Sequence, residues 1–262
     1  MDWQNKTETG LRIAKDAGAL ALDYFRKLDT LRIDQKGHQD FVTEADRNVE
    51  LTMRAALAQA FPDDAVVGEE HAPTPGTSGF TWVIDPIDGT ANFINAIPLW
   101  CVILAGVYVG KTRIGIIYDP VHDEAFVATR GGGATLNGVP MRVAKGKGIG
   151  EGTIGIGSNG RKRPENFMRA VQGLTQEGGV MVRNASGGIS LAYTASGRFL
   201  GYIEDHMNAW DCLAGQLLIQ EAGGRIEEQD ADQMIAHGGR VIAGAPEVFD
   251  DLLRIAKAAF PS

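Results

Sequence analysis

The spacing of apolar residues predicts two helices near the start of the chain. Residues 8–28 repeat apolar side chains at the three-to-four-residue spacing of one helical face. A second helix is expected after Thr43, which can cap the first turn together with Asp46, and this helix should end before Pro62. Each helix would present one apolar face to a neighbouring layer of the fold.

Short apolar runs bounded by glycine, proline and aspartate predict strands in both halves of the chain. In the first half the expected strands are 31–33, 66–67, 80–84, 100–109, 113–118 and 124–128. The last three are separated by tight turns and are expected to pair antiparallel. In the second half the expected strands are 153–156, 180–183, 199–203, 225–228 and 240–244, with helices near 164–176, 188–196, 208–222 and 246–260. Helices interleaved with mixed strands predict a layered α/β (α+β) fold.

Composition and charge narrow the class of protein. The 262 residues are 44% hydrophobic and 22% charged, which is ordinary for a globular chain and excludes intrinsic disorder. No apolar run approaches the roughly 18 residues of a membrane span, and the first residues show no secretory signal, so we expect a cytoplasmic protein. The net charge of −8 disfavours nucleic acid as the main ligand, whereas an excess of carboxylates suits a site that collects divalent cations.

Several common motifs are absent or incomplete. The two cysteines, Cys101 and Cys212, form no CxxC pair, which excludes zinc clusters and redox motifs. The segment 109–112 resembles the end of a phosphate-binding P-loop but lacks the first glycine, so a hairpin turn is the better interpretation. The segment 155–160 matches GxGxxG, but a basic run rather than an apolar helix follows it. Nucleotide-binding folds are therefore disfavoured.

The carboxylates near the end of the expected strand 80–84 give the strongest chemical signal. Asp85 and Asp88 flank a proline there, Gly89 lets the chain turn, and Glu69–Glu70 end another strand. Oxygen-rich clusters of this kind select hard cations such as Mg²⁺. A helix that begins after Gly89 would also present free N–H groups to an anion. The pattern predicts metal-assisted phosphoryl hydrolysis, and the alternative is that these aspartates are only turn residues.

Four segments, in order along the chain, resemble the signatures of the inositol monophosphatase family. They are Asp40–Asp46 (DFVTEAD), Gly68–Glu70 (GEE), Trp82–Phe93 (WVIDPIDGTANF) and Trp210–Gly215 (WDCLAG), the last followed by Glu221–Gly224 (EAGG). The resemblance covers residues 35 to 225, approximately. It implies a five-layered αβαβα sandwich of the sugar-phosphatase type, with residues 1–262 forming a single domain of two αβ halves, 1–145 and 146–262. It also implies Mg²⁺ dependence, inhibition by lithium and a homodimer.

The resemblance further implies a role for individual residues. The implied ligands of two to three Mg²⁺ ions are Glu69, Asp85, the carbonyl of Ile87, Asp88 and Asp211. The implied catalytic residues are Thr90 paired with Asp46, which orient a metal-activated water, and Glu70 behind them. The implied substrate-binding residues are Gly89, Thr90, Asp88, Ser186, Gly187, Glu204 and Asp211. The implied reaction is hydrolysis of inositol monophosphate to inositol and phosphate by in-line attack of water.

Some of these roles have a simpler alternative. Thr90 could be only a helix N-cap, and Asp46 only a member of a capping box. Glu204 could be a solvated acid at a strand end. Ser186 is followed by two glycines where the family usually has alanines, so its hydroxyl could be displaced by a residue. Lys36 either screens charge at the site or is a solvated lysine.

The metal residues do not separate the substrates that this superfamily uses. Alternatives are fructose 1,6-bisphosphate, histidinol phosphate and 3′-phosphoadenosine 5′-phosphate. A second phosphate would need an extra basic cluster, and Arg161–Lys162–Arg163 is either such a clamp or a solvated turn. A different class of function is a mainly binding or regulatory role with the transcription machinery. The complete set of site residues argues against that class, and we expect a small phosphorylated polyol as the partner.

Overall fold

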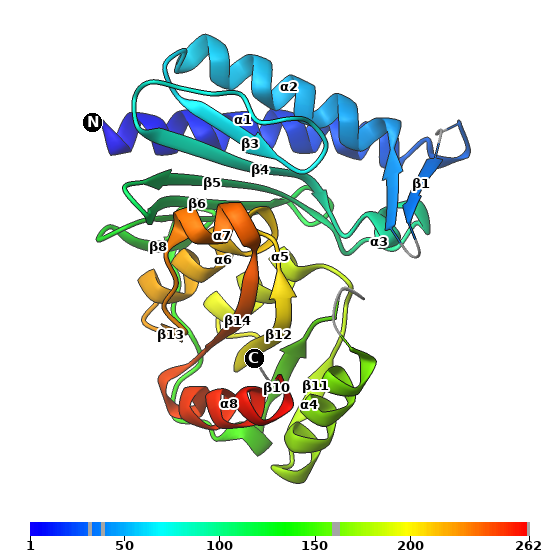
Figure 1. Cartoon of the computed structure of the whole chain (residues 1–262), viewed down its shortest axis with the longest axis vertical. Coiled ribbons are helices and arrows are strands. Elements are labelled where there is room, and N and C mark those ends of the chain that lie inside the picture. Colours follow the sequence, from blue (N-terminus) through cyan, green and yellow to red (C-terminus); the bar gives the residue numbers. More distant parts are fainter. Residues whose placement is uncertain (31–32, 38–39, 159–162, 261–262) are drawn as a thin grey trace.

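Two sheets and three layers of helices alternate in the structure. The computed structural model describes residues 1–30, 33–37, 40–158 and 163–260, with side chains at 1–29, 43–158 and 163–260. Figure 1 shows the order of the layers: α1 and α2, a seven-stranded sheet, α5 and α6, a five-stranded sheet, and then α4 with α8. These helices are α1 (Trp3–Phe25), α2 (Glu44–Ala60), α4 (Pro164–Gln176), α5 (Gly187–Ala195), α6 (Ala209–Glu221) and α8 (Pro246–Ala259). The expected αβαβα sandwich is confirmed.

The seven-stranded sheet is almost entirely antiparallel. Its strands run in chain order across the sheet, and only β3 and β4 are parallel. They are β3 (Ala65–Gly68), β4 (Phe80–Asp88), β5 (Cys101–Tyr108), β6 (Lys111–Asp119), β7 (Glu124–Thr129), β8 (Gly133–Leu136) and β9 (Val139–Pro140). The three strands expected to pair antiparallel do so as β5, β6 and β7. The segment 109–112 forms the β5–β6 hairpin, as expected.

Helices α1 and α2 cover one face of this sheet with an apolar stripe. Ile13 and Ala17 on α1 and Val49 and Met53 on α2 are buried against Trp82 and its neighbours. Thr43 caps α2 and forms the expected capping box with its third residue. Two strands, β1 (Ile33–Gly37) and β2 (Asp40–Thr43), precede α2 as a separate antiparallel pair.

Helix α6 lies between the two sheets and is buried nearly all round. It contacts β4, β5 and β6 on one side and β13 and β14 on the other. A helix in this position needs apolar residues on every face, which explains why its hydrophobic pattern shows no polar stripe. Gly115 on β6 lets the backbone of Ala214 approach, since a Cβ at Gly115 would lie 2.6 Å from the Ala214 carbonyl oxygen.

The five-stranded sheet mixes parallel and antiparallel pairs. Its order is β11-β10-β12-β14-β13, with β10 parallel to both neighbours. The strands are β10 (Thr153–Ile156), β11 (Val180–Val182), β12 (Gly201–Met207), β13 (Arg225–Ile226) and β14 (Gly239–Gly244). The larger apolar cluster runs from Val83 and Ile103 through α5 and α6 to Ile255 on α8. Residues of both halves of the chain therefore share this cluster.

The remaining elements differ in part from the expectations. The first helix is Trp3–Phe25 rather than 8–28. It begins earlier than expected because the Asp2 side chain caps its N-terminus by accepting the Asn5 N–H. The strand expected to end at residue 84 continues to Asp88, and the one expected at 199–203 is displaced to Gly201–Met207. Short elements that were not expected are β2, β8, β9, α7 (Ala231–His237), η1 (Leu28–Thr30) and η2 (Ile149–Glu151). Of the expected strand 31–33, residues 31 and 32 lie outside the described residues. None of the described helices has the length and hydropathy to cross a membrane.

Candidate active site

A β-bulge in β4 brings Asp85 and Asp88 to the same face of the sheet. Asp85 pairs with Ile103 and Asp88 with Cys101, so three steps along β4 match two along β5. Residues three apart in a regular strand point to opposite faces, and the extra residue of the bulge cancels this difference. Both carboxylates therefore point toward α5 and α6. Pro86, which has no N–H to donate to the ladder, lies in the bulge.

Carboxylates from three elements converge beside this bulge. Glu69 follows β3, Asp85 belongs to β4 and Asp211 lies in the first turn of α6. One oxygen from each lies within 4.8 Å of the other two. Burial raises the pKa of Asp85 well above its usual range, and the neighbouring carboxylates, Glu69 first, raise it further. Three carboxylates this close together, one of them buried and two half-buried, fit a hard divalent cation such as Mg²⁺.

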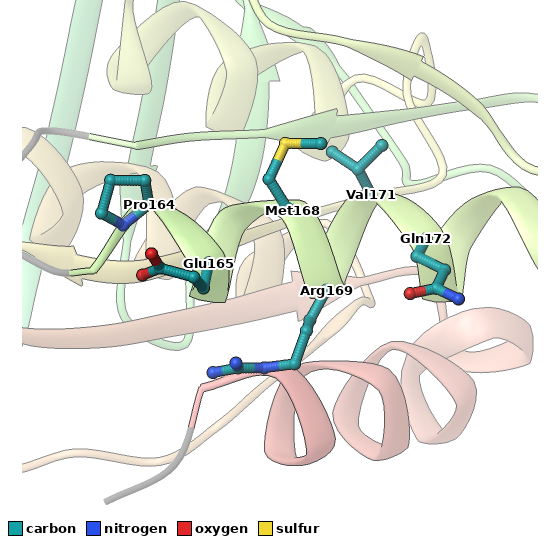
Figure 2. A pocket seen from close by; sticks show the side chains of 6 residues that line it. All are labelled: Pro164, Glu165, Met168, Arg169, Val171 and Gln172. Atoms are coloured by element: carbon teal, nitrogen blue, oxygen red, sulfur yellow. The ribbon is translucent and has the colours of Figure 1, made fainter.

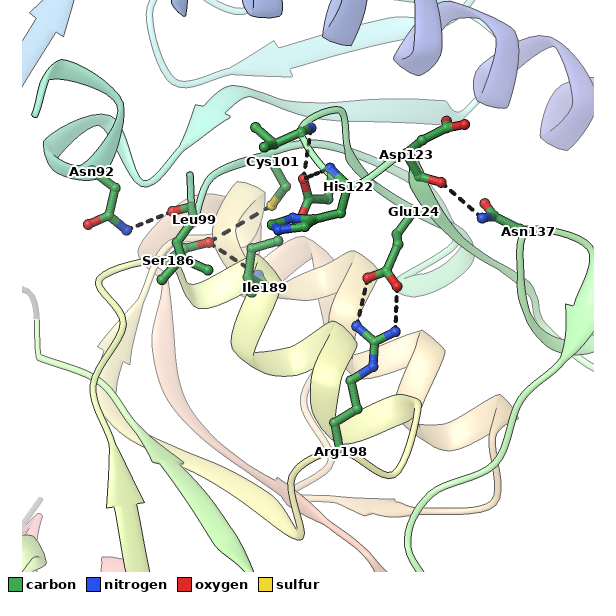
Figure 3. A network of polar contacts seen from close by, with 12 residues as sticks. Asn92, Leu99, Cys101, His122, Asp123, Glu124, Asn137, Ser186, Ile189 and Arg198 are labelled. Carbon is green, nitrogen blue, oxygen red and sulfur yellow. Dashed lines mark hydrogen bonds and ion pairs between the residues drawn. The ribbon is translucent and has the colours of Figure 1, made fainter. Parts of the chain in front are cut away.

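Asp88 is surrounded by hydrogen-bond donors instead. At the N-terminus of α5, the Ser186 hydroxyl donates to Oδ2 over 2.5 Å and the Gly188 N–H donates to Oδ2 over 2.7 Å. The Gly187 N–H donates to Oδ1 over 3.3 Å, and the Cys101 thiol lies 3.5 Å from Oδ2. Figure 3 shows Ser186 between Cys101 and the N–H of Ile189. Burial raises the pKa of Asp88, and these donors oppose that rise.

The two carboxylate oxygens of Asp46 accept hydrogen bonds from different residues, Thr43 and Thr90. Oδ2 accepts the Thr43 N–H over 2.8 Å, which completes the capping box of α2. The Thr90 hydroxyl lies 3.3 Å from Oδ1 and 3.1 Å from the carbonyl oxygen of Ile87. Burial raises the pKa of Asp46 from 3.8 to about 6. Asp46 is a member of the capping box, and its Oδ1 also contacts Thr90, so its catalytic role stays a prediction.

The turn after β4 places Gly89 and Thr90 at the start of α3 (Thr90–Ile94). Gly89 is the N-cap, with φ +94°, and Thr90 is the first helical residue, so the N-cap alternative for Thr90 is wrong. A side chain at Gly89 would be strained at this φ, and its Cβ would lie 3.0 Å from the Leu99 carbonyl oxygen. The Ile87 N–H donates to Asp85 Oδ1 over 3.0 Å. Whether the Gly89 and Thr90 N–H groups bind phosphate stays a prediction.

Glu204 is a buried residue of β12, on the side of the five-stranded sheet that faces the site. It is 6% exposed, so the alternative of a solvated strand-end acid is wrong. Burial raises its pKa to about 8, and Asp211 and Asp88 add to the rise. Of the expected basic cluster, Arg163 lines a small pocket together with Glu204. Arg161 and Lys162, and the side chain of Lys36, lie outside the described residues.

A separate hollow runs along α4, on the outer layer of the molecule. Figure 2 shows its six lining residues, all from this one helix: Pro164, Glu165, Met168, Arg169, Val171 and Gln172. It contains a single carboxylate and none of the expected site residues. The chemistry of the carboxylates, rather than the shape of the surface, therefore locates the candidate site.

Comparison with known proteins agrees with this geometry. The inositol monophosphatase family model matches residues 2–259. The chain belongs to the inositol monophosphatase family.

Relatives within this family cover nearly the whole chain. A Nus factor SuhB of Pseudomonas aeruginosa is 35% identical over 258 residues, which are 96% of this chain and 95% of that protein. An inositol-1-monophosphatase of Mesorhizobium japonicum is 36% identical over 250 residues, 94% of each chain. The crystal structure of the extragenic suppressor protein SuhB from Bartonella henselae superposes with a TM-score of 0.91 at 30% identity, covering 97% of this chain and 99% of that one.

Two residues that contact this inositol monophosphatase site were not anticipated from the sequence. Glu50 on α2 is fully buried and accepts the Glu70 N–H over 2.8 Å and the Arg54 Nε–H over 2.7 Å. Gly68 makes this possible, because a Cβ there would overlap the Glu50 carboxylate. The signal was a glutamate one helical turn after Asp46, on the apolar side of α2. Tyr202, two residues before Glu204 on β12, is the second.

Proposed function

We propose that the protein is a Mg²⁺-dependent phosphomonoesterase that hydrolyses inositol monophosphate to inositol and phosphate. The observation that carries the proposal is the convergence of Glu69, Asp85 and Asp211 within 4.8 Å, beside a fourth carboxylate, Asp88, on the same face of β4. Membership of the inositol monophosphatase family supports the same chemistry. A cluster of carboxylate oxygens next to the half-buried start of α3 suits a phosphate ester held against cations.

The proposed ligands of two to three Mg²⁺ ions are Glu69, Asp85, the Ile87 carbonyl, Asp88 and Asp211. When bound, Mg²⁺ supplies a water of lowered pKa and neutralises charge on the phosphate and the leaving alcohol. The donors on α5 hold Asp88 in one orientation, and Glu50 holds the backbone of Glu70 next to Glu69. Orienting ligands in this way is the usual task of hydrogen bonds around a metal site.

Thr90 and Asp46 orient and deprotonate the attacking water in this proposal. A Thr90 hydroxyl that donates to Asp46 Oδ1 keeps its lone pairs available to a hydrogen of the water. The pKa of Asp46, raised to about 6 by burial, lets Oδ1 take a proton near neutral pH. Glu70 adds negative charge near Asp46 and contributes to that raised pKa. The N–H groups of Gly89 and Thr90 hold the phosphate, and Ser186, Gly187 and Glu204 lie on the side of the leaving alcohol.

The direct test is phosphate release from a panel of esters. The panel contains inositol 1-phosphate, fructose 1,6-bisphosphate, histidinol phosphate and 3′-phosphoadenosine 5′-phosphate, each with Mg²⁺ and with Mg²⁺ plus Li⁺. We expect a preference for inositol 1-phosphate, inhibition by Li⁺, and loss of activity in Asp88→Asn. The matched control is Asp250→Asn, because the Asp250 side chain is 76% exposed on α8. Preference for another ester would replace the substrate, and no Mg²⁺-dependent release at all would refute the proposal.

The name of several relatives favours a second candidate function. The Pseudomonas aeruginosa relative, 35% identical, is a Nus factor SuhB. We propose as the alternative that this chain also binds components of the transcription machinery. A pull-down with and without Mg²⁺ tests it: a stoichiometric partner from that machinery supports the alternative, and its absence from both samples contradicts it.

The assembly and location of the protein are also proposals. We propose a homodimer, as the family resemblance implies, and a cytoplasmic location. Light scattering of the purified protein across a range of concentrations would give the mass of the particle directly. A monomer mass at all concentrations would contradict the dimer.

A further inference from the structure

Tyr202 and Glu204 form a buried polar pair on β12. Residues two apart on a strand share a face, and these two side chains are 3% and 6% exposed. The Tyr202 hydroxyl donates to Glu204 Oε2 over 2.5 Å. A Cβ at Gly187 would lie 3.9 Å from both the Tyr202 hydroxyl and the Asp211 carbonyl oxygen, and the Gly187 N–H donates to Asp88, which places the pair at the edge of the carboxylate site.

Two glycines of the adjoining chain segment give this pair its space. Gly155 on β10 pairs with Tyr202, and a Cβ at Gly155 would lie 2.7 Å from a ring carbon of Tyr202. A Cβ at Gly157 would overlap both the Tyr202 hydroxyl and Glu204 Oε2. Neither glycine has a positive φ, so close approach rather than backbone conformation requires glycine here. Glycine at these two positions therefore leaves room for the Tyr202 side chain and for its hydrogen bond to Glu204.

That hydrogen bond separates the roles of the two oxygens of Glu204. Oε2 is occupied by Tyr202, whereas no donor within the part of the chain that the structure describes reaches Oε1. Burial raises the pKa of Tyr202 well above its usual range, so the phenol keeps the proton that it donates. The bond in turn opposes the rise in the pKa of Glu204, which is still about 8, so the carboxylate form predominates above that pH.

We propose that Tyr202 is a positioning residue for Glu204: by occupying Oε2 it holds the carboxylate so that Oε1 accepts a hydrogen bond from a hydroxyl of the leaving alcohol. The inference rests on the proposed function. A neutral polyol supplies such a hydroxyl next to its phosphate ester.

The test compares Tyr202→Phe with the wild type on two esters at about pH 9, where Glu204 is mostly ionised, with Mg²⁺ present. Inositol 1-phosphate has hydroxyls for Glu204, and p-nitrophenyl phosphate has none. We expect KM for inositol 1-phosphate to rise about tenfold, the size of one hydrogen bond to a charged group, while kcat stays within about threefold. For p-nitrophenyl phosphate we expect kcat/KM to stay unchanged.

Three further variants separate positioning from general stability. Tyr193→Phe is the matched control, because the Tyr193 ring packs against Phe199 and under Arg198 and has none of the proposed site carboxylates among its neighbours, and it should change the kinetics of neither ester. Gly157→Ala presses on the same hydrogen bond from the other side and should raise KM for inositol 1-phosphate alone. In a double-mutant cycle with Glu204→Ala, Tyr202→Phe should change KM less than about twofold, because the residue it positions is gone.

Three results would contradict the positioning role of Tyr202 or the proposed function. An unchanged KM for inositol 1-phosphate in Tyr202→Phe overturns the inference. An equal loss on both esters also overturns it, because a structural defect does not distinguish the leaving group. A wild type that releases phosphate from neither ester refutes the proposed function itself, before any variant is compared.

Discussion

Asp85 and Asp88 lie on the same strand and the same face, and yet their surroundings are opposite in kind. Asp88 accepts hydrogen bonds from the Ser186 hydroxyl and from two N–H groups at the start of α5. Asp85 accepts one backbone N–H, that of Ile87, and faces the carboxylates of Glu69 and Asp211. Burial raises the pKa of both, but only Asp88 has several protein donors that oppose the rise.

The difference shows two ways of stabilising a buried carboxylate: hydrogen bonds from the protein at Asp88, and a bound cation at Asp85. The N-terminus of α5 offsets part of the cost of burying the charge of Asp88, although burial still raises its pKa. The charge of Asp85 is left for a cation to neutralise, so this part of the site is destabilising until the cation binds. Asp88 is therefore oriented by hydrogen bonds before a cation binds. Repulsion between Asp85 and its neighbouring carboxylates favours binding of the cation.

The largest expected effect comes from removing the charge of Asp85. Asp85→Asn should lower kcat/KM by roughly a thousandfold or more, because a ligand of the activating ion is lost. In EDTA the same variant should melt at a higher temperature than the wild type, because a buried charge beside Glu69 and Asp211 is gone. Activity assays and thermal melts check both parts. A lower melting temperature in EDTA would show that Asp85 is already stabilised by the protein.

Asp46, which has one oxygen bonded and one facing Thr90, should show an intermediate effect through pH. Its folded pKa of about 6 lies above the unfolded value of 3.8, so the folded state binds the proton more tightly. Its contribution to the free energy of unfolding is therefore full below pH 3.8 and is lost as pH rises through about 6. The loss is on the order of 3 kcal/mol. Urea unfolding of metal-free wild type and Asp46→Asn from pH 4 to 7 should differ by this slope, and parallel curves would contradict the shift.

Ser186 tests the donor side of the comparison. Ser186→Ala removes the hydroxyl from a buried carboxylate and should lower the free energy of unfolding by about 2 kcal/mol. Mg²⁺-dependent activity should fall about tenfold, because Asp88 loses part of its orientation. Ser196→Ala, at the other end of α5, is the control and should change neither quantity. A Ser186 variant as stable as this control would mean that the N–H groups suffice.

The smallest effect is expected at Cys101. Its thiol is a weak donor at 3.5 Å from Asp88, and it is fully buried in the apolar core. Cys101→Ala should change kcat/KM by less than about threefold and cost about 1 kcal/mol of stability through lost packing. Steady-state kinetics and urea unfolding measure both. A large loss of activity would place the thiol among the groups that hold Asp88.

Local patterns predicted those parts of the fold that depend on neighbours in sequence. The capping box at Thr43 and the apolar spacing after it gave the start of α2 correctly. The aspartates near Pro86 indicated oxygen chemistry at the end of an apolar strand, and the family resemblance implied the ligand set. The short strands β8 and β9 and helix α7 were missed, because a few residues in a glycine-rich or polar context have no usable periodicity.

Long-range contacts set the remainder of the site, and one sequence could not show them. Ser186 meets Asp88 across 98 positions of the chain, although its segment departs from the usual family pattern. Glu50 reaches the backbone of Glu70 only because Gly68 leaves room between helix and loop. The extension of β4 to Asp88 was missed because a proline normally ends a strand, whereas here it occupies the bulge.

The bulge in β4 also gives the main chain of Ile87, rather than its side chain, the contacts with the site. The main chain of this residue is released from the ladder, with its N–H turned to Asp85 and its carbonyl oxygen beside the Thr90 hydroxyl. An oxygen of the main chain is carried by all twenty amino acids, so exchanging the side chain at this position leaves it in place. What removes it is a change in length: shortening the Asp-x-x-Asp spacing by one residue keeps both carboxylates on one face but returns this peptide to the sheet.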